Sequence, residues 1–207
     1  MKLYDSNIPS GNSYKVHLLL SQLGIAYDVE DLDILADPSQ TREPKFLAKN
    51  PNGRIPVLEL DNGTCLAESN AILDYLADGT QYLPTGRLLR AQTLQWLFFE
   101  QYSHEPYVAV LKFWTYWGGL ENLSAEMRMR VTTRGQAALD VMGEHLAERS
   151  FFVDERYTIA DIALFGYTQS AAVVGFTVPP SIERWLTRVR EQPGHVAIKK
   201  DPLGKAP

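Results

Sequence analysis

The first 80 residues alternate between short strand-like runs and segments in which apolar residues recur with a helical period. In the segment 12–23 the apolar residues fall three or four positions apart, and Gly24 follows where such a helix would end. A later strand-like run leads into Asn62-Gly63, a pair typical of a tight turn between two strands. The pattern predicts, in chain order, a strand at 2–4, a helix at 12–23, strands at 27–31, 56–60 and 64–66, and a helix at 70–77. This order is a βαβ unit followed by a ββα unit.

Beyond Gly79 the apolar period is helical, and turn signals separate long segments rather than short ones. The predicted helices lie at 88–116, 125–148, 159–174 and 182–191. The last of them is ended by Pro193-Gly194. We therefore expect an α/β domain over 1–80 followed by an all-α domain over 86–207.

One helix start in the second part is unusually well marked. Thr158 precedes the segment 159–174, and Asp161 follows three residues later, with apolar Tyr157 and Ile162 on either side of the pair. This is the pattern of a capping box with a hydrophobic staple, which satisfies backbone N–H groups at the start of a helix. We interpret it as a folding signal rather than as a chemical site.

Composition and charge narrow the choice of partner. The 207 residues are 45% hydrophobic, 11% aromatic and 22% charged, as in an ordinary globular chain. The net charge is −5, and the acidic excess lies in residues 1–80, which hold 6 Lys and Arg against 12 Asp and Glu. An acidic chain without a basic stripe is not expected to bind nucleic acid or an anionic membrane. A small molecule is the expected partner.

Cys65 is the only cysteine, so an intrachain disulfide, a CxxC redox pair and a cysteine-rich zinc site are excluded. The N-terminal residues hold no apolar stretch long enough for a signal peptide, and nowhere do about 18 apolar residues run together. We therefore expect a cytoplasmic protein that does not enter a membrane.

Short motifs in the first 80 residues have a definite order and spacing. They are Leu3-Tyr4 with Ser10-x-Asn12-x-x-Lys15-Val16, then Asn50-Pro51-x-Gly53-x-Ile55-Pro56-Val57-Leu58, then Glu68-Ser69-x-Ala71-Ile72. With these motifs and the Thr158–Asp161 box, nearly the whole chain resembles the cytosolic glutathione transferase family, in a bacterial-like type that uses serine or asparagine. The resemblance implies a thioredoxin-like α/β domain that binds glutathione and an all-α domain that forms the electrophile site. It also implies a homodimer, with glutathione as co-substrate and no metal.

The implied reaction needs a thiolate. A thiol with a reference pKa of about 8.5 is mostly protonated at neutral pH, and lowering that pKa by about two units requires about 2.7 kcal/mol of preferential anion binding. The resemblance places the activating residue at Ser10, whose hydroxyl would donate to the sulfur as an oxyanion-hole donor does. Asn12 offers an amide donor to the same sulfur and is the alternative. In the simpler interpretation, Ser10 is a loop or capping serine and Asn12 only caps the helix.

Two further motifs suit the peptide part of glutathione. Pro56 opens a strand, so Ile55-Pro56 is a candidate cis bond, with an ordinary trans turn proline as the alternative. The resemblance implies that Ile55 pairs through its backbone with the cysteinyl unit. Glu68-Ser69 precedes a predicted helix, whose N-terminus attracts carboxylates. Ser69 is expected to hold the α-carboxylate of the γ-glutamyl end and Glu68 its ammonium group. The alternative is that the pair is only a helix cap.

The remaining candidates would bind the glycyl end of glutathione and the electrophile. The glycyl carboxylate of glutathione needs a cation, and the nearby candidates are Arg42, Lys45, Lys49 and Arg54. Of these we choose Lys49 and Arg54, each with a solvated surface charge as its alternative. For the electrophile, the aromatic-rich stretch of the helical domain offers Tyr107 and Trp114, although aromatic residues at helical spacing more often pack in a core.

The predicted function is that of a glutathione transferase, whose activated thiolate attacks a small, partly apolar electrophile. Glutathione-dependent reduction of peroxides or disulfides is the alternative among enzymes. A non-catalytic module that binds glutathione or a partner protein is the alternative outside them.

Overall fold

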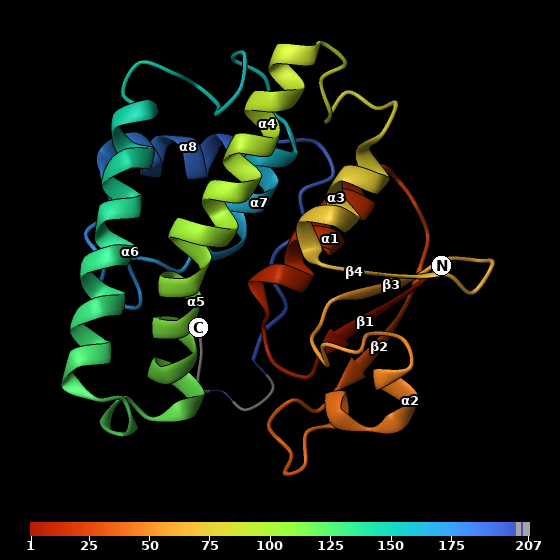
Figure 1. Cartoon of the computed structure of the whole chain (residues 1–207). Coiled ribbons are helices and arrows are strands. Elements are labelled where there is room, and N and C mark those ends of the chain that lie inside the picture. Colours follow the sequence, from red (N-terminus) through yellow and green to blue (C-terminus); the bar gives the residue numbers. More distant parts are fainter. Residues whose placement is uncertain (202–203, 205–207) are drawn as a thin grey trace. The chain divides into compact units, whose positions relative to one another are not determined.

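The computed structural model describes residues 1–201 and 204, and the chain forms two compact units (Figure 1). The first unit contains Met1–Asp78 together with the tail that begins at Pro193, and the second contains Gly79–Gln192. The sequence pattern assigned the tail to the helical domain. It belongs to the first unit instead, where Lys199 forms ion pairs with Asp5 and Asp31.

A four-stranded sheet in the order β2-β1-β3-β4 forms the centre of the first unit. Its strands are β1 (Lys2–Ser6), β2 (Asp28–Leu32), β3 (Val57–Glu59) and β4 (Cys65–Ala67). β1 is parallel to β2 and antiparallel to β3, and β3 is antiparallel to β4. The helices of this unit are α1 (Gly11–Gln22), α2 (Pro44–Leu47) and α3 (Ser69–Ala77), with a 3₁₀ turn at Gln40–Arg42. The expected βαβ–ββα order of a thioredoxin-like fold is confirmed.

Alternate strand residues face opposite sides of this sheet, as the twofold period of a strand requires. One buried cluster contains Tyr4, Leu32, Phe46 and Val57, and Phe46 belongs to α2. Leu3 is next to Tyr4 in β1, and Leu58 is next to Val57 in β3, so both face the other side of the sheet. Both are 0% exposed there. Figure 1 shows α1 and α3 together on that side of the sheet and α2 on the opposite side.

The second unit is helical, as expected. Its helices are α4 (Arg87–Phe99), α5 (Glu105–Phe113), α6 (Ala125–His145), α7 (Ile159–Thr168) and α8 (Pro180–Arg190). Two π-helical segments, Glu100–His104 and Trp114–Gly118, continue α4 and α5, and a 3₁₀ turn covers Leu120–Asn122. The helix predicted at 159–174 ends earlier, because the residues after Thr168 form turns that lead to Gly175, whose φ is positive. Among the described residues, no helix is both long enough and apolar enough to cross a membrane.

The capping box lies at the start of α7, a helix in which all ten residues are buried. The backbone N–H and the hydroxyl of Thr158 donate to one carboxylate oxygen of Asp161. The N–H of Phe152 and the indole N–H of Trp185 donate to the other oxygen. Burial raises the pKa of Asp161 to about 6, although these hydrogen bonds favour the ionised form. The predicted folding signal is therefore present and joins three separate segments.

Candidate functional site

Ser10 is the N-cap residue of α1. Its Oγ accepts a hydrogen bond of 3.3 Å from the backbone N–H of Ser13, and the residue is half-buried. Ser10 thus has the capping role that the simpler interpretation gave it. An accepted hydrogen bond leaves the hydroxyl proton available to another acceptor, so capping is compatible with the expected donation to a thiolate.

A group of hydrogen bonds joins α1 to the start of α3. Lys15 Nζ lies 2.8 Å from Asn12 Oδ1 and 3.4 Å from Ser69 Oγ, and Ser69 Oγ donates to Asn12 Oδ1 over 3.2 Å. Lys15 and Ser69 are buried, and Asn12 is half-buried. The structure therefore brings two sequence motifs together at one place. Lys15 was not among the predicted site residues, and the signal that pointed to it was a lysine among the apolar positions of α1.

The backbone changes direction sharply at the start of α3. Glu68 has a φ of 67°, which is unusual for a residue other than glycine. Its side chain is exposed and makes no capping hydrogen bond to the helix. The first N–H groups of a helix lack partners within the helix, so Ser69, the first residue of α3, can offer both a hydroxyl and an N–H to a carboxylate. Strained backbone of this kind is often found at functional sites.

Ile55 and Pro56 are joined by a cis peptide bond, as expected. β3 begins at the next residue, and its antiparallel register with β4 pairs Val57 with Ala67. β4 ends at Ala67, and α3 begins at Ser69, two residues further on. Within the part of the chain that the structure describes, the backbone N–H and C=O of Ile55 make no hydrogen bond. Both groups can therefore pair with an extended peptide.

The two predicted cations are held differently. Lys49 Nζ forms an ion pair of 2.7 Å with Glu59 Oε2 and lies 5.0 Å from the centre of the Tyr4 ring. The hydrogen bond to Glu59 is the main cause of a raised pKa at Lys49. Arg54 is exposed, and its backbone carbonyl accepts a hydrogen bond of 2.7 Å from Asn50 Nδ2, which fixes the loop that carries it. Arg54 is therefore the more available cation.

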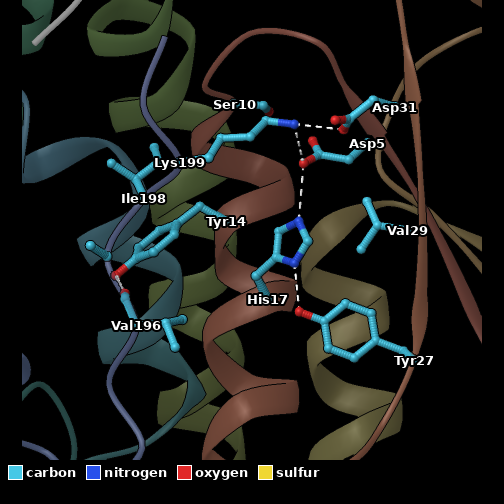
Figure 2. Close-up of a pocket in the computed structure, with 11 residues that line it drawn as sticks. Asp5, Ser10, Tyr14, His17, Tyr27, Val29, Asp31, Val196, Ile198 and Lys199 are labelled. Atoms are coloured by element: carbon cyan, nitrogen blue, oxygen red, sulfur yellow. Dashed lines mark hydrogen bonds and ion pairs between the residues drawn. The ribbon is translucent and has the colours of Figure 1, made fainter. Parts of the chain in front are cut away.

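A cavity of about 270 Å³ in the first unit was not predicted from the sequence (Figure 2). It lies between α1, β2 and the tail, and its polar lining is a connected series of ionisable groups. Asp5 Oδ2 lies 3.0 Å from His17 Nε2 and 2.8 Å from Lys199 Nζ, and Lys199 Nζ lies 2.6 Å from Asp31 Oδ1. Burial acts to raise the pKa of Asp5, but hydrogen bonds led by those of His17 and Lys199 outweigh it, so the pKa lies below its ordinary value.

The tail crosses α1 at close range. Tyr14 Oη donates to the backbone carbonyl of Val196 over 2.8 Å, as Figure 2 shows. Gly194 has a φ of 73°, and a Cβ on it would come within 2.9 Å of the Cα of Gln22, so this position needs glycine. Because Ser10 also lines the cavity, the tail forms one wall of a space that reaches the start of α1.

Lys199→Met is expected to lower the free energy of unfolding by about 1–3 kcal/mol at neutral pH, because the buried carboxylate of Asp5 loses a charged partner. The lowered pKa of Asp5 means that its stabilising contribution is present above the ordinary pKa and is lost as the pH falls through the folded-state pKa. The difference between the parent and Lys199→Met should therefore shrink below about pH 4. Denaturant unfolding at a series of pH values measures both effects.

The control for this prediction is Lys200→Met, which removes a neighbouring exposed lysine. It should change the free energy of unfolding by less than about 0.5 kcal/mol. Equal losses in the two variants at neutral pH would contradict the role given to Lys199.

Tyr107 and Trp114 lie in the second unit, on α5 and at the start of the π-helical segment that follows it. Both are half-buried. Trp114 packs edge-on against Phe113 with 5.9 Å between the ring centres, and Tyr107 lies beside Gly135 of α6. Both residues therefore pack within the unit, and their role toward an electrophile stays a prediction. The described residues include no group of three His, Cys, Asp or Glu placed to hold a metal ion.

Comparison with known proteins covers both units. Residues 1–78 match the family described as glutathione S-transferase, N-terminal domain, and residues 96–193 match glutathione S-transferase, C-terminal domain. The crystal structure of a glutathione S-transferase from Pseudomonas fluorescens Pf-5 is 50% identical, with a TM-score of 0.90 over 95% of this chain and 97% of that chain. A glutathione transferase from Pseudomonas putida, solved with one glutathione disulfide bound per subunit, is 30% identical, with a TM-score of 0.80 over 93% and 87% of the two chains.

Some curated relatives are much longer than this chain. Elongation factor 1-gamma-B of Xenopus laevis is 35% identical over 123 residues, which are 59% of this chain and 28% of that protein. The chain spans less than half the length of this and the other elongation factor 1-gamma relatives that it matches.

Proposed function

The chain belongs to the glutathione S-transferase family, and from this premise we propose that it binds glutathione on its first unit and activates the bound thiol as a thiolate. The thiolate attacks a small electrophilic, partly apolar substrate, so the protein acts as a glutathione transferase. Glutathione is the co-substrate, and the reaction written in this way uses no metal ion.

One observation carries the proposal, which is that Ile55 precedes β3 with its backbone groups unpaired among the described residues, while Ser69 begins α3 just after β4, the strand that pairs with β3. The backbone N–H and C=O of Ile55 suit the cysteinyl unit of an extended peptide. In the proposed complex the γ-glutamyl end of the peptide lies at Ser69 and Glu68, where a carboxylate meets helix N–H groups and an ammonium group meets a carboxylate. The glycyl carboxylate then points toward the loop of Arg54. Each charged part of glutathione has a partner of opposite charge or a hydrogen-bond donor.

The thiol is assigned to the start of α1, where Ser10 and Asn12 supply a hydroxyl and an amide. The N-terminus of a helix carries a partial positive charge, which also favours an anion. We further propose that Tyr107 and Trp114 give apolar surface to the electrophile, that the protein is a homodimer, and that it works in the cytoplasm. These assignments follow from the family and from the residues present.

Glutathione-dependent thermal stabilisation tests the binding half of this proposal. At 100 times its dissociation constant, glutathione is expected to stabilise the protein by about 2.7 kcal/mol. S-methylglutathione, which lacks a free thiol, should stabilise it to a similar extent. Ser69→Ala should weaken both ligands alike, because the change acts on the γ-glutamyl end. The proposal is wrong if neither compound stabilises the protein.

Thiolate absorbance as a function of pH tests the catalytic half. The bound thiol is expected to titrate about two units below its reference pKa of about 8.5. A screen of electrophiles with glutathione then measures turnover. Peroxide or disulfide reduction without conjugation would favour the reductase alternative. Binding without a thiolate would favour a non-catalytic module, the alternative to which the elongation factor 1-gamma match gives weight.

A further inference from the structure

Lys15 places an ammonium group inside the first unit. The residue is 0% exposed, although lysine is almost never fully buried unless it is paired. From α1 it reaches Asn12, one turn earlier, and Ser69 at the start of α3. Taking an ammonium group out of water costs several kcal/mol, so a lysine at this position indicates a task that an apolar residue could not perform.

The contact with Lys15 fixes the orientation of the Asn12 amide. An ammonium group donates hydrogen bonds and accepts none, so the atom that lies 2.8 Å from it is the amide oxygen and not the nitrogen. The hydroxyl of Ser69 donates to the same oxygen over 3.2 Å. Because an amide is planar, an oxygen held toward Lys15 and α3 turns the two N–H donors of Asn12 to the other side.

Ser69 has two acceptors for a single proton in the proposed complex. In the structure its hydroxyl donates to Asn12, whereas a γ-glutamyl carboxylate at the start of α3 would accept the same proton. When glutathione binds, the hydroxyl therefore turns from Asn12 to the carboxylate. Lys15 then continues to hold the amide, and its positive charge beside Ser69 also favours the incoming carboxylate.

We propose that Lys15 is a positioning residue, which orients the Asn12 amide toward the glutathione sulfur and links recognition of the γ-glutamyl carboxylate to activation of the thiol. This inference rests on the proposed function. It also assigns the thiolate donor, because an amide whose oxygen accepts from a cation is a stronger N–H donor than an unpolarised one. Ser10 has no comparable contact among the described residues, since its Oγ accepts from a neutral backbone N–H.

The test compares Lys15→Met with Val16→Ala in the full-length protein. Methionine keeps most of the volume of lysine and removes its charge and its donors, whereas Val16 is an equally buried neighbour on α1. Lys15→Met is expected to raise the pKa of the bound glutathione thiol by about one unit, which leaves about tenfold less thiolate below that pKa. Val16→Ala should lower the stability of the protein and leave the thiol pKa unchanged. Thiolate absorbance at saturating glutathione measures both variants.

A double-mutant cycle with Asn12→Ala shows whether Lys15 acts through Asn12. If it does, adding Lys15→Met to Asn12→Ala produces no further rise in the pKa of the bound thiol. A fully additive rise would overturn the positioning role, because Lys15 would then act on the thiol by itself.

The outcomes separate this inference from the proposed function. A parent protein that binds glutathione without lowering the thiol pKa overturns the proposed activity, and this is seen before any variant is made. An unchanged thiol pKa in Lys15→Met, with glutathione still bound, overturns the role of Lys15 alone. If the methionine variant does not fold, Lys15→Gln replaces it, because glutamine keeps an uncharged donor. Lys15→Gln is expected to raise the thiol pKa by less than one unit. An unchanged thiol pKa in this variant would also overturn the role of Lys15.

Discussion

Asp161→Ala is expected to cost about 3–5 kcal/mol of folding free energy, enough to unfold a protein of ordinary stability. The carboxylate is 0% exposed and accepts hydrogen bonds from Thr158, Phe152 and Trp185. Alanine would leave these donors buried without an acceptor, and each such loss costs about 1–3 kcal/mol. The denaturant midpoint and the yield of folded protein measure the effect.

Glu126→Ala is the matched control for this prediction. Glu126 is also an acidic residue in the first turn of a helix, α6, but its side chain is exposed. Its removal should change the free energy of unfolding by less than about 0.5 kcal/mol. Similar losses in the two variants would indicate that Asp161 stabilises the protein through the helix dipole rather than by accepting hydrogen bonds from buried donors.

The same carboxylate predicts a dependence of stability on pH. Burial raises its pKa from 3.8 to about 6 in the folded protein. A raised pKa means that the folded state binds the proton more tightly, so this contribution is fully present below about pH 4 and is lost as the pH rises through about 6. A shift of about two units corresponds to about 3 kcal/mol. The parent should lose stability relative to Asp161→Asn over this interval, and a constant difference between the two proteins would contradict the prediction.

Removal of both candidate thiolate donors, in Ser10→Ala with Asn12→Ala, is expected to lower kcat about 100- to 1000-fold. The hydroxyl and the amide are the side-chain donors assigned to the sulfur at the start of α1, and without them the bound thiol should return toward its reference pKa. Glutathione affinity should change little, because Ile55 and Ser69 hold the peptide. Steady-state rates with an electrophile found by screening, and the dissociation constant of glutathione, give the two quantities.

Ser124→Ala separates catalysis from helix capping in this experiment. Ser124 is the N-cap of α6 and accepts a hydrogen bond from the N–H of Met127, as Ser10 does from Ser13 at α1. Loss of either cap should cost about 1 kcal/mol of stability. Ser124→Ala should keep the full kcat. Full activity in the double variant at Ser10 and Asn12 would show that the thiol is activated elsewhere.

The order of helices and strands followed from the apolar period because that period is a local property of the chain. The turn at Asn62-Gly63 and the capping box at Asp161 were predictable for the same reason, since each depends on residues a few positions apart. The cation for the glycyl carboxylate was not predictable. Lys49 pairs with Glu59 because the fold brings β3 close to the residues that follow α2. A contact between such separate segments cannot be predicted from a local sequence pattern.

The cavity and the Lys15 contacts were missed for a related physical reason. Asp5 receives its charged partner from Lys199, which lies near the other end of the sequence. Ser69 meets Lys15 and Asn12 only after the sheet has brought α3 beside α1. A polar residue at an apolar position was the available signal in both Asp5 and Lys15, and it indicates that a partner exists without indicating which residue it is.

The tail that returns to the first unit has a consequence for synthesis on the ribosome. Residues 1–78 emerge first, and domains generally fold in the order in which they are made. Lys199, which pairs with the buried Asp5, emerges only after the whole of Gly79–Gln192. Until the tail has been made, the nascent first unit lacks the lysine partner of Asp5, so this ion pair can form only after the helical unit has been synthesised.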